Sequence, residues 1–212
     1  MKKLLMTGAT GFVGKNVLPL LRVQYDVTTC GRSSENSIRA DLAKEISVLS
    51  DHFDIVLHAA GKAHTTPRTE DEIKDYDDVN YQGTANLCAA LEKYGLPETI
   101  IFLSSAAVYG CDQGENVDET HELNPKTPYA ISKKKAEDYL IEWCSQHDVR
   151  LAILRPSLIA GPNPPGNLGS MIKGIASGRY LRIAGGKARK SVLMVEDIAR
   201  LMPLLEQGGG YL

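Results

Sequence analysis

The sequence predicts an α/β fold built on a doubly wound parallel sheet. Short apolar, β-rich runs alternate with longer helix-like stretches over the first 155 residues. This alternation is typical of a parallel sheet covered by helices on both faces. A glycine-rich segment directly follows the first run and opens the first helix. In such a sheet, ligands collect where the strands end, near the point at which the strand order reverses.

Five runs are expected to be strands, because each is short, apolar or β-branched, and bounded by Gly, Asp or Pro. They are Lys3–Thr7, Asp26–Cys30, Asp54–Ala59, Thr99–Ser104 and Arg150–Arg155. The stretches between them that are expected to be helical are Phe12–Arg22, Leu42–Leu49, Val79–Tyr94 and Tyr129–Gln146. Residues 1–155 are therefore predicted to form a Rossmann-like domain.

The pattern changes after Arg155. Gly161–Gly166 reads GPNPPG, which suits a loop or hinge and neither a helix interior nor a central strand. Beyond it we expect a helix at Leu168–Ser177, a strand at Tyr180–Ala184 and a helix at Glu196–Glu206 that Pro203 interrupts. Three glycines before Tyr211 predict a turn into a further strand. Residues 156–212 are thus expected to form a partial lobe interleaved with the end of the sheet.

Composition excludes several classes of protein. The 212 residues are 43% hydrophobic and 24% charged, which is typical of a globular domain. The 24 basic and 26 acidic residues give a net charge of -2, which argues against nucleic-acid binding. The chain has no apolar run of membrane-spanning length and no pattern of a signal peptide, so we expect a cytoplasmic protein without a membrane partner.

Cysteine and histidine spacing predicts no metal site. Four cysteines are widely spread, without a C-x-x-C pair, and five histidines show no ligand spacing. Neither a zinc site nor a disulfide framework is indicated, which agrees with a reducing compartment.

The glycine-rich segment has the spacing of a phosphate-binding loop. Gly8 permits a tight turn, Gly11 allows the backbone to approach a pyrophosphate, and Gly14 lets helix and strand pack closely. The phosphates would lie at the free N–H groups of the helix that follows. Its place after the first strand of a βαβ unit favours dinucleotide binding.

The end of the second strand bears on the choice of dinucleotide. NAD-binding proteins usually place an acidic residue here to hold the adenosine ribose, and Gly31 occupies that place. Arg32 follows, and a guanidinium would suit a 2′-phosphate, which favours NADP over NAD. An ordinary surface arginine is the alternative. Asp41 and Leu42 are candidates for adenine contact, with a helix N-cap as the alternative.

Tyr129 and Lys133 stand one helical turn apart, after a helix start at Thr127-Pro128. A tyrosine has a reference pKa near 10 and needs a neighbouring cation to act as a base at neutral pH. Ser104 and Ser105 follow the fourth strand, where a substrate is expected to lie. The alternative for either serine is a turn-capping hydroxyl.

These segments together resemble the extended short-chain dehydrogenase/reductase superfamily, and within it the NAD-dependent epimerase/dehydratase family that acts on nucleotide sugars. The matching stretches run in family order. They are TGATGFVG (7–14), HAAG (58–61), VNYQGTANL (79–87), FLSSAAVYG (102–110), YAISK (129–133), LRPSLIAGP (154–162) and VEDIA (195–199).

The resemblance implies roles for individual residues. Ser105, Tyr129 and Lys133 would form the catalytic centre, with Ser105 preferred to Ser104 because it stands four positions before Tyr109 of the V-Y-G turn. Tyr129 would transfer a proton on a sugar hydroxyl or ketone, Lys133 would lower its pKa, and Ser105 would bind the reacting oxygen. The other residues implied at the cofactor are Thr10, Phe12, Val13, Ala59, Ala60, Gly61, Asn80, Pro156 and Ser157.

The sequence departs from the family pattern around the substrate. Ala106 and Ala107 stand where the family's dehydratases commonly carry Asp-Glu, which disfavours 4,6-dehydration. Lys190, beside Arg189, replaces the arginine that binds the diphosphate. With Asn167, these two cations are the candidates for the nucleotide part of a sugar nucleotide, and Ser105 is the candidate at the sugar.

The expected function is that of an NAD(P)-dependent 4-epimerase or 4-keto-sugar reductase acting on a nucleotide sugar. The alternative is a non-catalytic dinucleotide-binding sensor, against which the Tyr–Lys pair argues. The resemblance also implies that members of the family extend beyond the position that matches residue 212. Residues 156–212 would then supply only the beginning of a substrate lobe. It further implies a homodimer through the helices near 79–94 and 129–146, with packing within one chain as the alternative.

Overall fold

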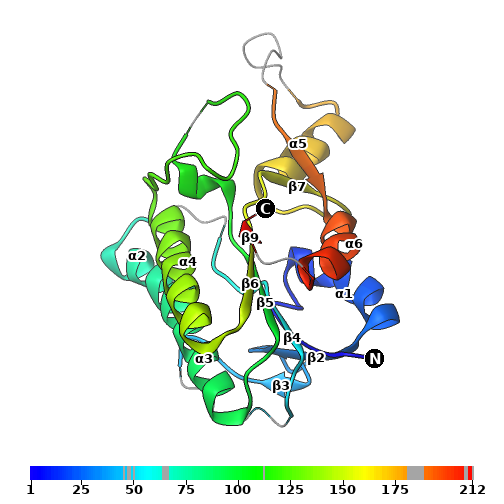
Figure 1. Ribbon diagram of the computed structural model, residues 1–212. Helices are drawn as coiled ribbons and strands as arrows, with labels where there is room; N and C mark the ends of the chain where they lie inside the picture. Colours follow the sequence, from blue (N-terminus) through cyan, green and yellow to red (C-terminus); the bar gives the residue numbers. More distant parts are fainter. Residues whose placement is uncertain are drawn as a thin grey trace.

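The computed structural model describes residues 1–44, 46, 49, 51–63, 67–111, 113–180 and 189–207, and the backbone of 210 and 211. A parallel sheet takes its strands in the order β3-β2-β1-β4-β5-β6-β9 (Figure 1). The strands are β1 (Lys3–Thr7), β2 (Asp26–Gly31), β3 (Ile38–Arg39), β4 (Ile55–His58), β5 (Thr99–Leu103), β6 (Arg150–Leu154) and β9 (Gly210–Tyr211). A separate pair joins β7 (Leu158–Ala160) to β8 (Val192–Met194).

Helices cover both faces of the sheet, as the alternation predicts. The helices are α1 (Phe12–Gln24), α2 (Glu70–Tyr76), a π-helix η1 (Asp77–Gln82), α3 (Gly83–Tyr94), a 3₁₀ turn η2 (Ala106–Tyr109), α4 (Pro128–His147), α5 (Gly166–Ala176) and α6 (Val195–Leu205). Helices α3 and α4 lie on one face, and α1 and α6 lie on the other (Figure 1).

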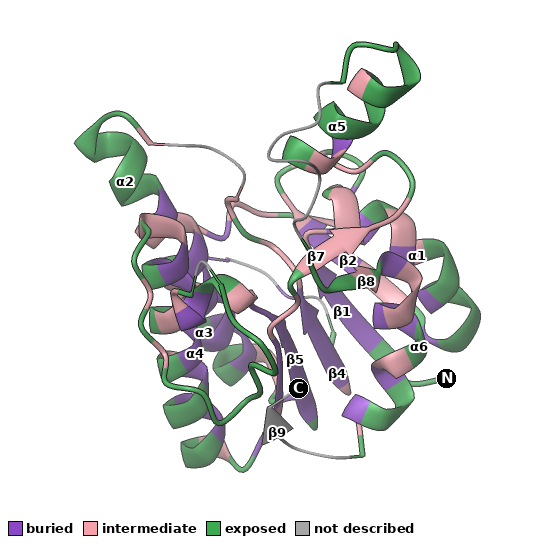
Figure 2. Cartoon of the chain, turned by 90° about the horizontal axis from the view of Figure 1, so that it is seen from above, coloured by how far each residue is buried: buried purple, intermediate pink, exposed green. Residues whose placement is uncertain are grey.

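Alternating side chains of the strands form two hydrophobic cores. Leu5 and Val56 point toward α3 and α4, where Trp143 closes the core. Leu4 and Leu57 point the opposite way, toward α1 and α6. The purple strands between the two helix layers in Figure 2 show this double burial. Because both faces are covered, these strands read as continuous apolar runs in the sequence.

The predicted elements agree closely with the structure. Each predicted strand of the main sheet is present with ends shifted by at most one residue, and Gly210–Tyr211 forms the further strand that the glycines predicted. The two-residue strand β3 and the three-residue strands β7 and β8 were missed, because they are too short to show periodicity. Most of the strand predicted at Tyr180–Ala184 lies outside the described residues.

Two helix predictions need correction. The predicted helix Leu42–Leu49 is not helical at its described positions, where Leu42, Ile46 and Leu49 are buried in the core. Their spacing therefore reflects contact with the core rather than a helix. Helix α6 continues through Pro203 to Leu205, since a proline in the last turns removes only one backbone hydrogen bond.

The segment after residue 156 adds one helix and one strand to the sheet domain and places another helix away from the sheet. Helix α6 packs against α1, and β9 pairs with β6. Helix α5 lies away from the sheet and is largely exposed (Figure 2). The boundary at residue 155 remains a prediction. Among the described helices, none combines the length and apolar character that crossing a bilayer requires.

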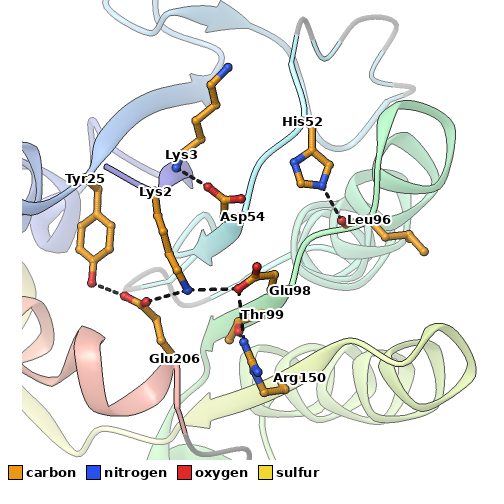
Figure 3. A network of polar contacts seen from close by, with 10 residues as sticks. All are labelled: Lys2, Lys3, Tyr25, His52, Asp54, Leu96, Glu98, Thr99, Arg150 and Glu206. Carbon is orange, nitrogen blue, oxygen red and sulfur yellow. Dashed lines mark hydrogen bonds and ion pairs between the residues drawn. The ribbon is translucent and has the colours of Figure 1, made fainter.

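A polar network lies at the amino ends of the strands, on the side of the sheet away from the glycine loop (Figure 3). The Lys2 ammonium lies 3.1 Å from a carboxylate oxygen of Glu98 and 3.3 Å from one of Glu206. The Tyr25 hydroxyl donates to Glu206, and Arg150 lies 3.5 Å from Glu98. This network connects the end of α6 to β1 and to the loop before β5.

A buried ion pair fixes α4 against the end of β6. Arg155 donates to both carboxylate oxygens of Glu137, with its closest contact at 2.8 Å, and the Glu137 side chain is fully buried. The Ser104 hydroxyl also donates to Glu137, and Arg155 donates to the Tyr109 hydroxyl at 3.2 Å. The pair therefore joins α4 to the segment that follows β5.

Removing one partner of this pair should be costly. We expect Glu137→Gln to lower the free energy of unfolding by about 3–5 kcal/mol, because the Arg155 charge would remain buried without its carboxylate. The double variant Glu137→Leu/Arg155→Met should be more stable than Glu137→Gln, because it leaves no unpaired charge. Urea unfolding of the three proteins measures this, and equal losses in both variants would contradict it.

Candidate active site

A cleft of about 480 Å³ lies at the carboxyl ends of β1, β4, β5 and β6. The strand order reverses there, because β1 pairs with β2 on one side and with β4 on the other. This is where an open α/β sheet binds its ligand. The predicted site residues that line the cleft are Gly8, Gly11, Phe12, Val13, Gly14, Ala59, Gly61, Ser105, Tyr129, Lys133, Pro156 and Ser157.

The glycine loop forms a cradle that larger residues would block. Gly8 has φ +74°, and a Cβ on it would lie 2.6 Å from the Ala59 carbonyl carbon. A Cβ on Gly14 would lie 2.3 Å from the Gly8 oxygen. Gly11 caps α1 without a side chain, so the first N–H groups of that helix remain available to an anion. The cradle therefore fits a pyrophosphate.

Tyr129 lies in the first turn of α4, which is fixed by a capping residue and a proline. The Thr127 hydroxyl caps the helix by accepting from the Ala130 N–H at 3.2 Å, and Pro128 occupies the first turn. The side chains of Tyr129 and Ser105 both line the cleft and interact electrostatically. Burial raises the pKa of Tyr129, while the interaction with Ser105 opposes that rise. The phenol is therefore held in its protonated form in this structure.

Ser105 both caps a turn and faces the cleft. Its hydroxyl accepts from the Ala107 N–H at 3.2 Å, which is the turn-capping role, and the residue also lines the cleft beside Tyr129. The Ala106 N–H donates to the Pro156 oxygen at 3.0 Å. These contacts fix the serine at the ends of β5 and β6.

Lys133 lies one turn below Tyr129 and is buried, with 4% of its surface exposed. Its ammonium donates to the Leu103 carbonyl at 2.9 Å and lies 4.6 Å from the centre of the Phe102 ring. Burial lowers the pKa of Lys133 to about 8, and the Glu137 carboxylate opposes this fall. A Cβ on Gly61 would lie 3.0 Å from the ammonium, so the glycine leaves room for it.

Asn80 connects helix α4 to the wall of the cleft. Its amide oxygen accepts from the Lys62 N–H at 2.7 Å, and its amide nitrogen donates to the Lys62 carbonyl at 3.1 Å and to the Ser132 hydroxyl at 2.8 Å. Ser132 in turn donates to the Tyr129 carbonyl at 2.8 Å. Asn80 belongs to the π-helix η1, a form often found at functional sites. It therefore positions the site from behind the cleft.

His58 lies in a chain of hydrogen bonds under the cleft. The Thr7 hydroxyl accepts from the Ala60 N–H and lies 2.7 Å from Nδ1 of His58, to which it donates when the ring is protonated on Nε2. Thr84 donates to the Asn80 carbonyl, so Nε2–H of His58 donates to Thr84, at 2.9 Å. Burial lowers the pKa of His58 to about 3, which agrees with a neutral ring protonated on Nε2.

The remaining candidates lie outside this cleft. Thr10 lines a second hollow, and the Ala60 N–H is bonded to Thr7. Arg32 is exposed. Asp41 accepts from the Ala43 N–H at 3.3 Å, and Leu42 is buried against Gly83. Three candidates for the nucleotide are exposed outside the cleft: Asn167 lies in the first turn of α5, and Arg189 and Lys190 lie just before β8.

Some residues of the cleft gave no signal in the sequence. Lys62 and Leu103 line it. So do Pro165 and Leu168, which come from the start of α5. Only their places in the sequence could have suggested them: Lys62 follows HAAG, Leu103 precedes the two serines, and Pro165 and Leu168 lie in or just after the proline-rich segment. In the part of the chain that the structure describes, no cluster of His, Cys, Asp or Glu could hold a metal ion.

Comparison with known families settles the kinship of the chain. Residues 4–208 match the model of the NAD dependent epimerase/dehydratase family. The chain belongs to this family. The match runs from the first strand through helix α6, so it covers the glycine loop and the Tyr129–Lys133 pair alike.

Curated relatives in this family act on diphosphate-linked sugars, according to their names. An N-acetyl-alpha-D-glucosaminyl-diphospho-ditrans,octacis-undecaprenol 4-epimerase of Escherichia coli O157:H7 is 31% identical over 93% of this chain and 61% of its own length. A UDP-glucose 4-epimerase of Vibrio cholerae is 28% identical over 95% of this chain and 65% of its own. The chain thus spans less than two thirds of either relative.

Solved structures show the same fold. RMD from Pseudomonas aeruginosa, complexed with NADPH, superposes with a TM-score of 0.82 at 24% identity, covering 100% of this chain and 74% of that one. A UDP-N-acetylglucosamine 4-epimerase from Methanobrevibacter ruminantium M1 gives a TM-score of 0.83 at 24% identity, covering 99% and 75%. The Rossmann-like fold predicted from the sequence is confirmed.

The buried ammonium should leave a signature in the pH dependence of stability. The pKa of Lys133 is 10.5 in its unperturbed state and about 8 in the folded chain. Between these pH values the unfolded chain binds more protons, so this group makes stability rise with pH. We expect wild type to gain stability relative to Lys133→Met from pH 8 to 10.5 in urea unfolding. A constant difference across this range would contradict the assignment.

Proposed function

We propose that this chain carries out NAD(P)-dependent redox chemistry at C4 of a nucleotide-diphosphate sugar, as a 4-epimerase or a 4-keto-sugar reductase. The observation that carries the proposal is the convergence of Ser105, Tyr129 and Lys133 on one wall of the cleft whose other wall is the glycine loop. A non-catalytic dinucleotide sensor would not need a phenol and a buried ammonium on one face of a helix.

The dinucleotide fits the glycine cradle. Its pyrophosphate would lie on the N–H groups at the start of α1, and the rest of the cofactor would extend past Ala59 and Gly61, which line the same cleft after β4. Relatives whose structures contain NADPH or NAD support this choice. When bound, the cofactor supplies or accepts the hydride at the sugar carbon.

The protein's own residues handle the proton. Tyr129 would take the proton from the C4 hydroxyl or return it to the C4 ketone through its phenol oxygen. Ser105, which lines the same cleft as Tyr129, would bind the same sugar oxygen and hold it in line. Lys133 would supply the positive charge that a phenolate needs. In this structure, however, burial dominates and raises the pKa of Tyr129, so the lowering predicted from the Tyr–Lys spacing is not seen.

The sugar is expected to carry a diphosphate. The names of the relatives combine C4 epimerisation with UDP or with a polyprenyl diphosphate, and the diphosphate is their shared feature. Arg189 and Lys190 are exposed cations that would suit such a group, with Asn167 as a neutral partner. An epimerase would retain its cofactor between the two half-reactions, whereas a reductase would release it each cycle.

The free cysteines support a reducing, cytoplasmic location. Cys30, Cys88 and Cys144 are buried thiols, and Cys111 is exposed. Disulfides are typical of oxidising compartments, and none joins these four residues.

Replacement of the phenol tests the catalytic role. We expect Tyr129→Phe to slow hydride transfer from 4-deuterated NADH or NADPH to a UDP-linked 4-keto sugar by 10²–10⁴-fold, because the general acid is lost. Tyr139→Phe is the matched control, since it removes a hydroxyl from the same helix at a residue that packs against Tyr81. Mass spectrometry of the sugar measures the transferred deuterium.

Equal deuterium transfer by wild type and Tyr129→Phe would remove the proton-transfer role from Tyr129. Binding of the dinucleotide by wild type without transfer to any diphosphate-linked 4-keto sugar would favour the sensor instead. The panel should include a polyprenyl-diphosphate sugar, because the relative from Escherichia coli is named for such a substrate.

We also propose that the chain forms a homodimer through α3 and α4. Helix α4 exposes Ile131 and Ile141 by 40% and 37% of their surfaces, which supports an apolar contact with a second copy. Sedimentation velocity should show a dimer that Ile141→Glu weakens. Val23→Glu introduces the same charge at an exposed valine of α1 and should leave the dimer intact. A monomeric wild type would contradict the proposal.

A further inference from the structure

We propose that Asn36 replaces the acidic residue that usually holds the adenosine ribose, and that its neutral amide leaves the 2′ position open to phosphate. The chain would therefore accept both NAD and NADP. This inference rests on the proposed dinucleotide binding and adds a residue that determines its specificity. It follows from the contacts around the end of β2.

Asn36 occupies the space that a side chain at the end of β2 would fill. A Cβ on Gly31 would lie 3.1 Å from Nδ2 of Asn36 and 3.5 Å from Oδ1. In dinucleotide-binding folds, the acid that bonds the ribose stands at this end of the strand. Gly31 carries no side chain, and the loop returns an amide to the same place.

The amide presents an acceptor that has no partner. Nδ2 donates to the Ser33 carbonyl at 3.0 Å, which fixes the orientation of the amide, because a flipped amide would place two acceptors together. Oδ1 is buried and makes no hydrogen bond. Within the described residues, it is the one buried side-chain oxygen or nitrogen without a partner. A buried unpaired acceptor is costly, so a ligand donor is expected to satisfy it.

The loop that carries Asn36 is already in place. The Ser37 N–H donates to the Thr29 hydroxyl at 2.9 Å, and the Ala40 N–H donates to the Gly31 carbonyl at 3.1 Å. Asn36 itself is 9% exposed. The acceptor is therefore held before any ligand arrives, which lowers the entropic cost of binding.

The surroundings suit the adenosine end of a dinucleotide. Asn36 lines a second hollow together with Ala9 and Thr10, so it lies beside the glycine loop that would bind the pyrophosphate. The same hollow is lined by Lys15 and Arg22, with Glu35 as the opposing charge. Arg32, the cation predicted to meet a 2′-phosphate, is exposed on the loop between Gly31 and Asn36.

The neutral amide has a specific consequence for the cofactor. A ribose hydroxyl can donate to Oδ1 in either dinucleotide, because NADP keeps its free 3′-hydroxyl. A carboxylate at this position would repel the 2′-phosphate, whereas an amide carries no charge to do so. Asn36 would thus supply the ribose contact common to both cofactors, and Arg32 would act on the phosphate alone.

Titration of NADH and NADPH with the chain, followed by nicotinamide fluorescence, tests this division of roles. We expect Asn36→Ala to weaken both dinucleotides by about 3- to 10-fold, the loss of one hydrogen bond. Asn36→Asp should lower the affinity for NADPH by about tenfold or more, while leaving the affinity for NADH unchanged or higher. Arg32→Ala should weaken NADPH only. Ser34→Ala, on the same exposed loop, is the matched control and should change neither affinity.

Unchanged affinities in Asn36→Ala would overturn the inference, and so would equal weakening of NADH and NADPH in Asn36→Asp. Thermal unfolding of each variant checks that it is folded. This check matters most for Asn36→Asp, in which a carboxylate oxygen replaces the amide nitrogen that donates to the Ser33 carbonyl. If wild type binds neither dinucleotide, the proposed function fails together with the inference. If it binds both and the Asn36 variants do not discriminate, only the inference fails.

Discussion

The bond from the Lys133 ammonium to the Leu103 carbonyl is the interaction on which the rest of the site depends. A lysine seldom leaves water, and this one is held at the end of a central strand with the ring of Phe102 beneath it. The charge can remain there because the Glu137 carboxylate, one turn further along the same face of α4, stabilises it. Gly61 has no side chain that would crowd the ammonium. Tyr129 then stands one turn nearer the opening, so its position follows from the pitch of α4.

Local patterns predicted the fold well. The glycine loop, the Tyr–Lys spacing and the apolar strands each lie within a few consecutive residues, and each depends on backbone geometry that a short segment determines by itself. The same reasoning overestimated the helix at Leu42–Leu49, where the described residues meet the core without forming a helix. Apolar spacing shows that a side chain is buried, and this is not always evidence for the element that buries it.

The parts that the sequence did not reveal connect residues that are distant along the chain. Glu137 meets Arg155 from another element, and Asn80 meets Ser132 across 52 positions. Asn36 is near Gly31 in sequence, yet only the folded loop shows that its amide fills the space above the glycine. The cation Arg32 was visible in the sequence because its charge suggested a role, whereas a neutral asparagine in a polar loop suggested none.

The chain of hydrogen bonds through His58 has a consequence for how protons can move below the cleft. At one end the Ala60 N–H can only donate, and at the other end the Asn80 carbonyl can only accept. The carbonyl end fixes the order: Thr84 donates to Asn80 and therefore accepts from Nε2–H of His58, because reversing this bond would leave the Thr84 oxygen and the Asn80 carbonyl as two acceptors facing each other. Burial lowers the pKa of His58 to about 3, so the ring stays neutral with both nitrogens hydrogen-bonded, and it would not compete for a proton with the role proposed for Tyr129.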